Sequence, residues 1–414
     1  MYVGLIAVGV LAYANSLSGP FIFDDIPAIV ENADIREVLP LWRSPAESDR
    51  PSINSRPVVR LSLSLNNAFG GLEVRGYHLA NIGFHILCAL LLAVCLQRTL
   101  VLSSMAPSVS KYAASLASAS ALIGLLHPVN NQTVNYVTQR SEALVAVFFL
   151  GTLYALLRGA CGGRRWLLVS VVACLLGMGS KEVMVSAPIL ALLFDRTFLA
   201  GDFASALRVR RAYYLALSST WVVLIALMWA RPHGDSIGLD LGVGTIGYGL
   251  SQAGALLVYL KLLVWPQPLL IDYGITQVTT VADTTTELLA IVLLLAATIH
   301  ALVRRPILGF VGAWFFIILA PTSSLIPLLG EVATERRMYL LSMALLTLSV
   351  VLVWLVLQRF SLQRIAPVVL AVAGLAFFGR TWGNATKTFA APRASGGPCW
   401  RCALTMQEPA LPSE

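Results

Sequence analysis

The amino-acid sequence predicts an all-α protein that crosses a membrane many times. Hydrophobic residues make up 57% of the 414 positions, and the mean hydropathy is +0.77. Apolar runs recur along the chain, whereas only 12% of the residues are charged. Because a helix needs about 20 apolar residues to span a bilayer, this composition excludes a mainly soluble protein. We predict about eleven transmembrane helices.

The helices are expected at the apolar runs, which leave one long loop near the N-terminus. The first helix covers residues 2–17, and a polar loop of residues 18–76 follows, with amphipathic surface helices at 34–43 and 57–69. If segment 247–265 crossed the membrane, Arg304 would not fall on the cytoplasmic side. The segment contains Lys261 and ends in W-P-Q-P, so we interpret it as a re-entrant or surface helix. Two short helices miscounted elsewhere would resolve the conflict equally well. The remaining helices are expected at 78–97, 114–127, 142–157, 166–179, 184–199, 212–230, 287–303, 308–326, 338–357 and 365–379.

Arginine and lysine residues mark the loops expected on the cytoplasmic side. They include Arg98 and Lys111, Arg158 with Arg164 and Arg165, Arg196 with Arg208, Arg210 and Arg211, Arg304 with Arg305, and Arg359 with Arg364. By the positive-inside rule, this distribution places the N-terminus in the cytoplasm and the loop of residues 18–76 on the opposite side. The rule also accounts for the net charge of +8, so no nucleic-acid partner is expected.

Two adjacent carboxylates, Asp24 and Asp25, follow the first helix and are the leading candidates for a site. A charge at the bilayer centre costs about 2.5–3.5 kcal/mol, so polar residues at helix ends are expected to face a shared external cleft. The residues that should join the carboxylates on the non-cytoplasmic side are Arg56, His78, His127, Arg140, Lys181, Glu182, Glu335, Arg336, Arg337 and Tyr339.

Each of these candidates also has a structural interpretation. An Asp-Asp pair can cap a helix, and a His-Pro pair can end one. Lys181 and Glu182 could form an ion pair that closes a hairpin. Arg336 and Arg337 could anchor the start of a helix, and we weigh this structural role and a functional role equally. The functional role remains open because the positive-inside rule does not account for arginines on the outer side.

The cysteines and the C-terminal tail suggest no further site. The C-x-x-C of Cys399 and Cys402 stands without a second cysteine pair, so a metal cluster is not expected. Residues 383–414 are rich in Gly, Ala, Pro and Ser and show no periodicity. We therefore expect a membrane domain at residues 1–382 and an unstructured tail at 383–414. The other cysteines lie in or beside apolar helices, where a thiol needs no further role: Cys88, Cys95, Cys161 and Cys174.

Eight short motifs occur in series along residues 10–382, and together they carry a family resemblance. They are N-S-L-S-G-P-F-I-F-D-D (15–25), S-R-P-V-V-R-L-S-L-S-L-N (55–66), G-Y-H-L-A-N-I-G-F-H (76–85), L-L-H-P-V (125–129), Q-R-S-E-A-L (139–144), S-K-E (180–182), L-K-L-L-V-W-P (260–266) and E-R-R-M-Y-L (335–340). The series resembles the protein O-mannosyltransferase-like family of the GT-C superfamily, in particular the branch with C-terminal tetratricopeptide repeats. Such repeats are not recognisable after residue 382.

The resemblance implies a GT-C type membrane glycosyltransferase that inverts the sugar's anomeric centre. Its donor would be mannose or a similar hexose on a polyprenyl or dolichyl phosphate carrier. The acceptor would be a hydroxyl, of Ser or Thr in a protein or of a glycan. The site would face the non-cytoplasmic side of a multi-pass membrane protein, for which we expect a bacterial inner membrane rather than the endoplasmic reticulum.

The resemblance also assigns residues to this reaction. Asp24 would be the catalytic base and Asp25 its neighbour, and two adjacent carboxylates are expected to raise the pKa of one of the pair. The lipid phosphate would meet Arg140, Lys181, Arg336 and Arg337. No cofactor is required, although Asp24 and Asp25 could hold a divalent metal ion. Supporting roles would fall to Arg56, His78, His127, Glu182, Glu335 and Tyr339.

A membrane transporter or lipid flippase is the alternative from another class of protein. A charged external cleft also suits translocation, and interrupted helices are common in transporters. Transporters usually consist of two related halves, however, and the sequence shows no internal symmetry. We therefore favour the enzyme.

The positive-inside pattern predicts that the loop carrying Asp24 and the loop carrying Arg337 face the same, non-cytoplasmic side. Single cysteines introduced by Ser48→Cys and Val332→Cys should both react with a membrane-impermeant thiol reagent added outside. Labelling of the two positions from opposite sides would contradict a shared cleft.

Overall fold

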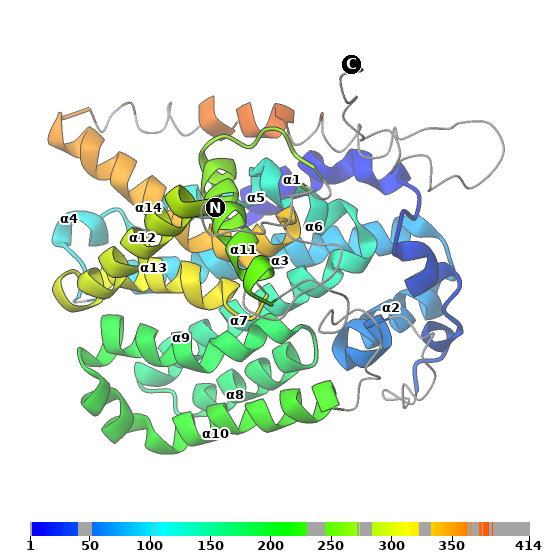
Figure 1. Cartoon of the computed structure of the whole chain (residues 1–414), viewed down its shortest axis with the longest axis horizontal. Helices are drawn as coiled ribbons and strands as arrows, with labels where there is room; N and C mark the ends of the chain where they lie inside the picture. The colour runs from blue at the N-terminus through cyan, green and yellow to red at the C-terminus, as the bar shows by residue number, and fades with distance from the viewer. Residues whose placement is uncertain are drawn as a thin grey trace.

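The computed structural model is a bundle of α-helices, with no strand among the residues that it describes (Figure 1). Those residues are 2–39, 52–102, 104–229, 245–270, 273, 284–322, 333–362, 365, 372–374, 376–380 and 383. Apart from Gly383, the predicted tail lies outside them. The prediction of an all-α, multi-pass membrane protein is confirmed.

Long helices alternate with short 3₁₀ and π turns along the chain. In order, they are α1 (Tyr2–Tyr13), η1 (Ala14–Ser18), η2 (Ile26–Val30), η3 (Ala33–Arg36), η4 (Ser52–Ser55), α2 (Pro57–Gly70), α3 (Val74–Leu100), α4 (Pro107–Ser110), α5 (Ala113–Leu126), η5 (Pro128–Asn130), α6 (Asn131–Asn135), η6 (Val137–Gln139), α7 (Arg140–Ala160), α8 (Arg165–Met178), η7 (Glu182–Ser186), α9 (Ala187–Phe194), η8 (Asp195–Ala200), α10 (Phe203–Trp229), α11 (Thr245–Val264), α12 (Thr285–Arg304), α13 (Pro306–Leu319), η10 (Glu335–Arg337) and α14 (Met338–Arg359).

The predicted count of eleven crossings is not confirmed. In the described ranges, six helices are long and apolar enough to span a membrane: Val74–Leu100, Val137–Ala160, Glu182–Ala200, Phe203–Trp229, Thr285–Arg304 and Glu335–Arg359. A seventh would combine Ala113–Leu126 with Pro128–Asn135, which meet at 54°. Four more apolar helices are shorter: Tyr2–Ser18, Arg165–Met178, Gly249–Val264 and Pro306–Leu319.

Helix α7 is the centre of the bundle, because nearly all of its length is buried among its neighbours. It packs against α3 on one side and α8 on the other, and α9 and α14 also touch it. Helix α12 packs on α13 but has no buried residue, so most of its apolar side chains point outward, as expected for a helix with one face toward lipid.

The loop after α1 packs on one end of this bundle. Its buried apolar residues Ile29 and Ile35 meet Leu63 of α2 and Tyr77 of α3. Of the two predicted surface helices, 57–69 is confirmed as the helix α2. In the second, residues 34–39 contain the short turn η3 and no longer helix, and residues 40–43 lie outside the described part of the chain.

A buried ion pair holds the connection between α9 and α10. The Asp195 carboxylate, 0% exposed, accepts from Arg210 Nη1 at 2.9 Å and from the Tyr214 hydroxyl at 2.6 Å. Arg210 has non-helical dihedrals (φ −124°, ψ 30°) inside α10, so the helix is kinked where the arginine turns toward this partner.

We predict that Asp195→Ala destabilises the fold far more than a change at a nearby exposed carboxylate. It would leave the Arg210 cation without its partner, and breaking a buried pair costs about 3–5 kcal/mol of the free energy of unfolding. Asp202→Ala, which removes an exposed cap on the Ser205 amide, should cost much less. Thermal or denaturant unfolding in detergent measures both, and equal losses would contradict the role of the pair.

Candidate active site

The two adjacent carboxylates take up different positions. The Asp25 side chain is fully buried, whereas Asp24 is exposed. Asp25 Oδ1 accepts from the Thr138 backbone N–H at 2.8 Å, and Oδ2 accepts from the Ile22 N–H at 3.2 Å. Asp25 therefore ties the loop after α1 to turn η6, while Asp24 presents its carboxylate to the surroundings.

Burial, rather than the neighbouring carboxylate, changes the acidity of this pair. Desolvation raises the pKa of Asp25 to about 6, and the backbone hydrogen bonds from Thr138 and Ile22 oppose the increase. The expected mutual repulsion of the carboxylates is thus not the cause of the raised pKa.

Arg140 lies buried at the start of α7, and the protein itself occupies its guanidinium. Its Nε donates to Asn81 Oδ1 at 2.7 Å, while Nη1 and Nη2 donate to the carbonyls of Ser62 and Tyr77 at 3.1 and 3.0 Å. The ring of Phe84 lies 5.8 Å from the guanidinium carbon. This arrangement favours a structural clamp joining α2, α3 and α7 over the expected contact with a lipid phosphate.

Lys181 belongs to a group of four charges that pair with each other. Its Nζ donates to Glu142 of α7, and Arg56 Nη2 donates to the Glu182 carboxylate at 3.4 Å. Burial lowers the pKa of Lys181, and the nearby Glu142 charge opposes this effect. Lys181 and Glu182 therefore do not form the ion pair with each other that the structural interpretation suggested. Each pairs with a residue of another segment, Lys181 with Glu142 and Glu182 with Arg56.

Glu335, Arg336 and Arg337 form the turn η10, directly before α14. All three are buried, with exposed fractions of 4%, 7% and 8%. Glu335 accepts from the Tyr273 hydroxyl at 2.9 Å, and the Arg336 backbone N–H donates to Gln132 Oε1 of α6 at 2.9 Å. This second contact joins the arginine pair to the segment that precedes turn η6.

The candidate histidines contact backbone carbonyls. His78 Nε2 lies 3.2 Å from Gly19 O, and His127 Nε2 lies 3.2 Å from Leu263 O. The Tyr339 hydroxyl lies 2.6 Å from Nδ1 of His85, a residue to which the sequence assigned no role. These contacts join separate helices, so the three candidates act within the packing of the bundle.

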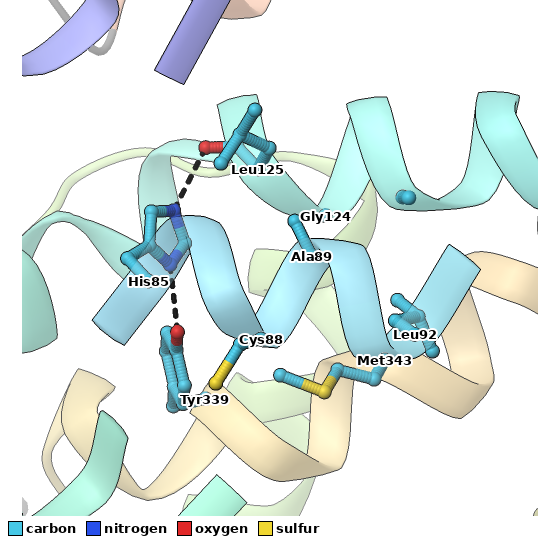
Figure 2. A pocket seen from close by; sticks show the side chains of 9 residues that line it. His85, Cys88, Ala89, Leu92, Gly124, Leu125, Tyr339 and Met343 are labelled. Carbon is cyan, nitrogen blue, oxygen red and sulfur yellow. Dashed lines mark hydrogen bonds between the residues drawn. The ribbon is translucent and has the colours of Figure 1, made fainter. Parts of the chain in front are cut away.

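Figure 2 shows the pocket beside His85 and Tyr339, which is not the candidate site. Its other walls include Leu92, Leu125 and Met343, from α3, α5 and α14. No carboxylate lines it. Its apolar walls suit a packing defect between helices better than a reaction centre.

The described residues do not gather three His, Cys, Asp or Glu side chains in a way that could hold a metal ion. At the carboxylate pair itself, both oxygens of Asp25 already accept backbone N–H groups. Asp24 would therefore be the main ligand that the pair offers, which makes this a poor fit for a divalent ion. Cys399 and Cys402 lie outside the described residues.

Two groups near the carboxylates were missed by the sequence analysis. The Tyr136 hydroxyl accepts the Asp24 backbone N–H at 2.9 Å, and Arg60 Nη2 donates to the Asp34 carbonyl at 2.8 Å within the loop. Arg60 was a detectable candidate, since an arginine among the apolar residues of an amphipathic helix needs a buried partner. No pattern in the sequence singles out Tyr136.

Comparison with known proteins supports the family resemblance. The chain is 32% identical over 155 residues to mouse protein O-mannosyl-transferase TMTC3, covering 35% of this chain and 15% of that protein. It is 25% identical over 248 residues to human TMTC3 (55% and 26% covered) and 29% identical over 215 residues to human TMTC4 (46% and 28% covered). The chain is homologous to protein O-mannosyl-transferases.

The homology covers only part of these relatives. The matched stretches span less than a third of the length of each of the three. No protein-family model matches the chain, and no solved structure matches it. The relatives are mouse and human proteins, so the expected bacterial inner membrane is not supported. Their transferase names favour the enzyme over the transporter.

The raised pKa of Asp25 predicts a specific pH dependence of stability. A carboxyl whose pKa is about 6 when folded and about 4 when unfolded stabilises the fold below about pH 4, and this contribution is lost as the pH rises to about 6. The loss is on the order of 1–3 kcal/mol. Asp25→Asn cannot ionise, so its stability should change less across this range.

Melting temperatures at about pH 4.5 and pH 7.5 test this prediction. Glu31→Gln, at an exposed carboxylate of the same loop, should keep the pH dependence of the unmodified protein. The same pH dependence in the unmodified protein and in Asp25→Asn would contradict the assignment.

Proposed function

We propose that the chain is a glycosyltransferase that moves a sugar, mannose or a similar hexose, from a polyprenyl or dolichyl phosphate carrier to a hydroxyl acceptor. Ser or Thr of a protein is the preferred acceptor, in keeping with the names of the relatives. The reaction takes place on the non-cytoplasmic side of the membrane, as the arginine-rich loops suggest.

The observation that carries this proposal is the exposed Asp24 carboxylate on a loop fastened to the bundle by its neighbour. Asp25 is buried and uses both oxygens on backbone N–H groups, so it positions the loop and does not reach a substrate. Asp24 lies next to this anchor and is exposed. A catalytic base needs this combination of a fixed backbone and an accessible oxygen.

The chemistry requires one base and one region of positive charge. Asp24 takes the proton from the acceptor hydroxyl, and the acceptor oxygen attacks the anomeric carbon on the face opposite the phosphate. The bond from that carbon to the phosphate oxygen breaks, and its electron pair leaves with the lipid phosphate. This single displacement inverts the anomeric centre, and general base catalysis contributes about 10²- to 10⁴-fold to the rate.

Arg336 and Arg337 are the strongest candidates for the lipid phosphate. Arg336 is joined to Gln132, and the backbone carbonyl of Gln132 accepts the Tyr136 N–H at 3.1 Å, next to the Asp24 contact. This short path connects the base to the arginine pair. Fixed cations stabilise the charge that develops on a leaving phosphate.

The other predicted cations fit the donor less well. The guanidinium of Arg140 is enclosed by protein acceptors. Lys181 is paired with Glu142, and Arg56 is paired with Glu182, so the positive charge is balanced within each pair. A phosphate near Lys181 would have to compete with a carboxylate already in place. We therefore assign these three cations to holding the helix ends together around the site.

Asp24→Asn should lower sugar transfer by about 100-fold or more, because the amide keeps the size of the side chain but cannot accept the proton. Binding of the lipid-linked donor should be unchanged. Transfer of radiolabelled sugar from polyprenyl phosphate mannose to a Ser/Thr peptide measures the first quantity. Retention of the labelled donor by the purified protein measures the second.

Glu31→Gln is the matched control, since it makes the same chemical change at an exposed carboxylate of the same loop. It should transfer sugar at the rate of the unmodified protein. Full transfer by Asp24→Asn would show that another group is the base.

A further inference from the structure

Tyr136 lies directly behind the exposed carboxylate of Asp24. It is 3% exposed and caps the C-terminal end of α6, where its N–H donates to the Gln132 carbonyl at 3.1 Å. Its hydroxyl accepts the Asp24 backbone N–H at 2.9 Å. Its ring meets the ring of Phe23 edge-on, with centroids 6.4 Å apart. Tyr136 thus contacts both residues at the tip of the loop.

The backbone at this tip is in a conformation that needs support. Phe23 has φ of +45°, in the left-handed region that residues with a side chain rarely adopt. Such a residue costs on the order of 1–3 kcal/mol and persists only where its surroundings hold it. The Tyr136 ring on Phe23 and the Tyr136 hydroxyl on the following amide supply that support.

A phenol hydroxyl can accept one hydrogen bond and donate another. At Tyr136 the accepted bond comes from the Asp24 amide, which leaves the hydroxyl proton to be donated to a second acceptor. Burial, together with the Asp24 charge, raises the pKa of Tyr136 well above its usual range. The phenol therefore stays protonated and remains a donor.

We propose that Tyr136 is the positioning residue for Asp24, holding the Asp24 backbone amide through its hydroxyl so that the exposed carboxylate faces the acceptor. The proposal rests on the proposed function of Asp24 as the base. On this proposal the buried segment before α7 orients Asp24 through Tyr136, in addition to holding Asp25 through the Thr138 N–H.

Tyr136→Phe tests the proposal, because it keeps the ring on Phe23 and removes only the hydroxyl. The kcat for sugar transfer should fall by about tenfold, the effect expected for the loss of one hydrogen bond to a backbone amide. The KM for the lipid-linked donor should be unchanged. A general loosening of the fold would affect both constants, and an unchanged kcat would overturn the proposal.

The control is Tyr213→Phe, at a buried tyrosine on the opposite side of α7. The Tyr213 hydroxyl lies 2.9 Å from Ser170 Oγ, between α8 and α10, so its loss removes a buried hydrogen bond away from Asp24. This variant should retain the kcat of the unmodified protein. A comparable fall in kcat for the two variants would mean that loss of any buried tyrosine hydroxyl has this effect, and would overturn the proposal.

Amide hydrogen exchange tests the contact without relying on activity. In the unmodified protein the Asp24 N–H should exchange slowly although the side chain is exposed, and in Tyr136→Phe it should exchange about tenfold faster. Fast exchange of this amide in the unmodified protein would overturn the proposal even if Tyr136→Phe fails to fold.

The two measurements also separate the inference from the function on which it rests. If the unmodified protein transfers no sugar but the Asp24 amide is protected through Tyr136, the proposed function fails and the contact stands. If sugar is transferred and Tyr136→Phe keeps the kcat of the unmodified protein, the positioning role alone fails.

Discussion

A buried positive charge, the guanidinium of Arg140, holds together the end of the bundle where the carboxylates lie. Transfer of a cation from water into a protein interior costs several kcal/mol unless its N–H groups find acceptors. Here Asn81 and the carbonyls of Ser62 and Tyr77 provide them. Because these groups belong to α2 and α3 and Arg140 begins α7, one side chain aligns three helices and fixes the turn just before α7.

The loop that carries Asp24 and Asp25 is hydrogen-bonded to that turn and to the residue before it. Asp25 binds the Thr138 amide within the turn, and Asp24 binds the Tyr136 hydroxyl just before it. From Pro128 to Gln139 the backbone is divided into short helical pieces with breaks between them, and such breaks are tolerated at membrane depth only where protein groups satisfy the freed backbone groups. Asn81 does so for the carbonyls of Val134 and Val137, at 3.3 and 3.4 Å.

The contacts of each charged side chain in this region indicate whether it holds helix ends together or is a candidate for binding the lipid phosphate. Lys181 and Arg56 have carboxylate partners, so their charge is balanced inside the protein. The two arginines before α14 are joined to the irregular segment through Gln132 and lie beside Glu335, whose own contact is with a tyrosine. The contact through Gln132, which leads on to the Asp24 contact of Tyr136, is the observation that favours this arginine pair for the lipid phosphate.

The sequence alone determined the class of the protein and the order of its helices. Apolar runs of membrane-spanning length can form little other than helices in a bilayer, so the spans Val74–Leu100, Val137–Ala160 and Phe203–Trp229 were predictable, although the third begins before the predicted residue 212. The amphipathic pattern of residues 57–69 predicted α2. The acidic pair was also recognisable, because few charges occur in such a chain and these two are adjacent.

Only the tertiary structure decided what each polar residue does. Whether a carboxylate is exposed like Asp24 or buried like Asp25 depends on the Thr138 amide, which lies 113 residues away along the chain. The enclosure of Arg140 and the role of Tyr136 depend in the same way on segments brought together by packing. Apolar periodicity specifies which segments enter the membrane, but hydrogen bonds between distant segments determine which charges remain accessible, and no local pattern encodes them.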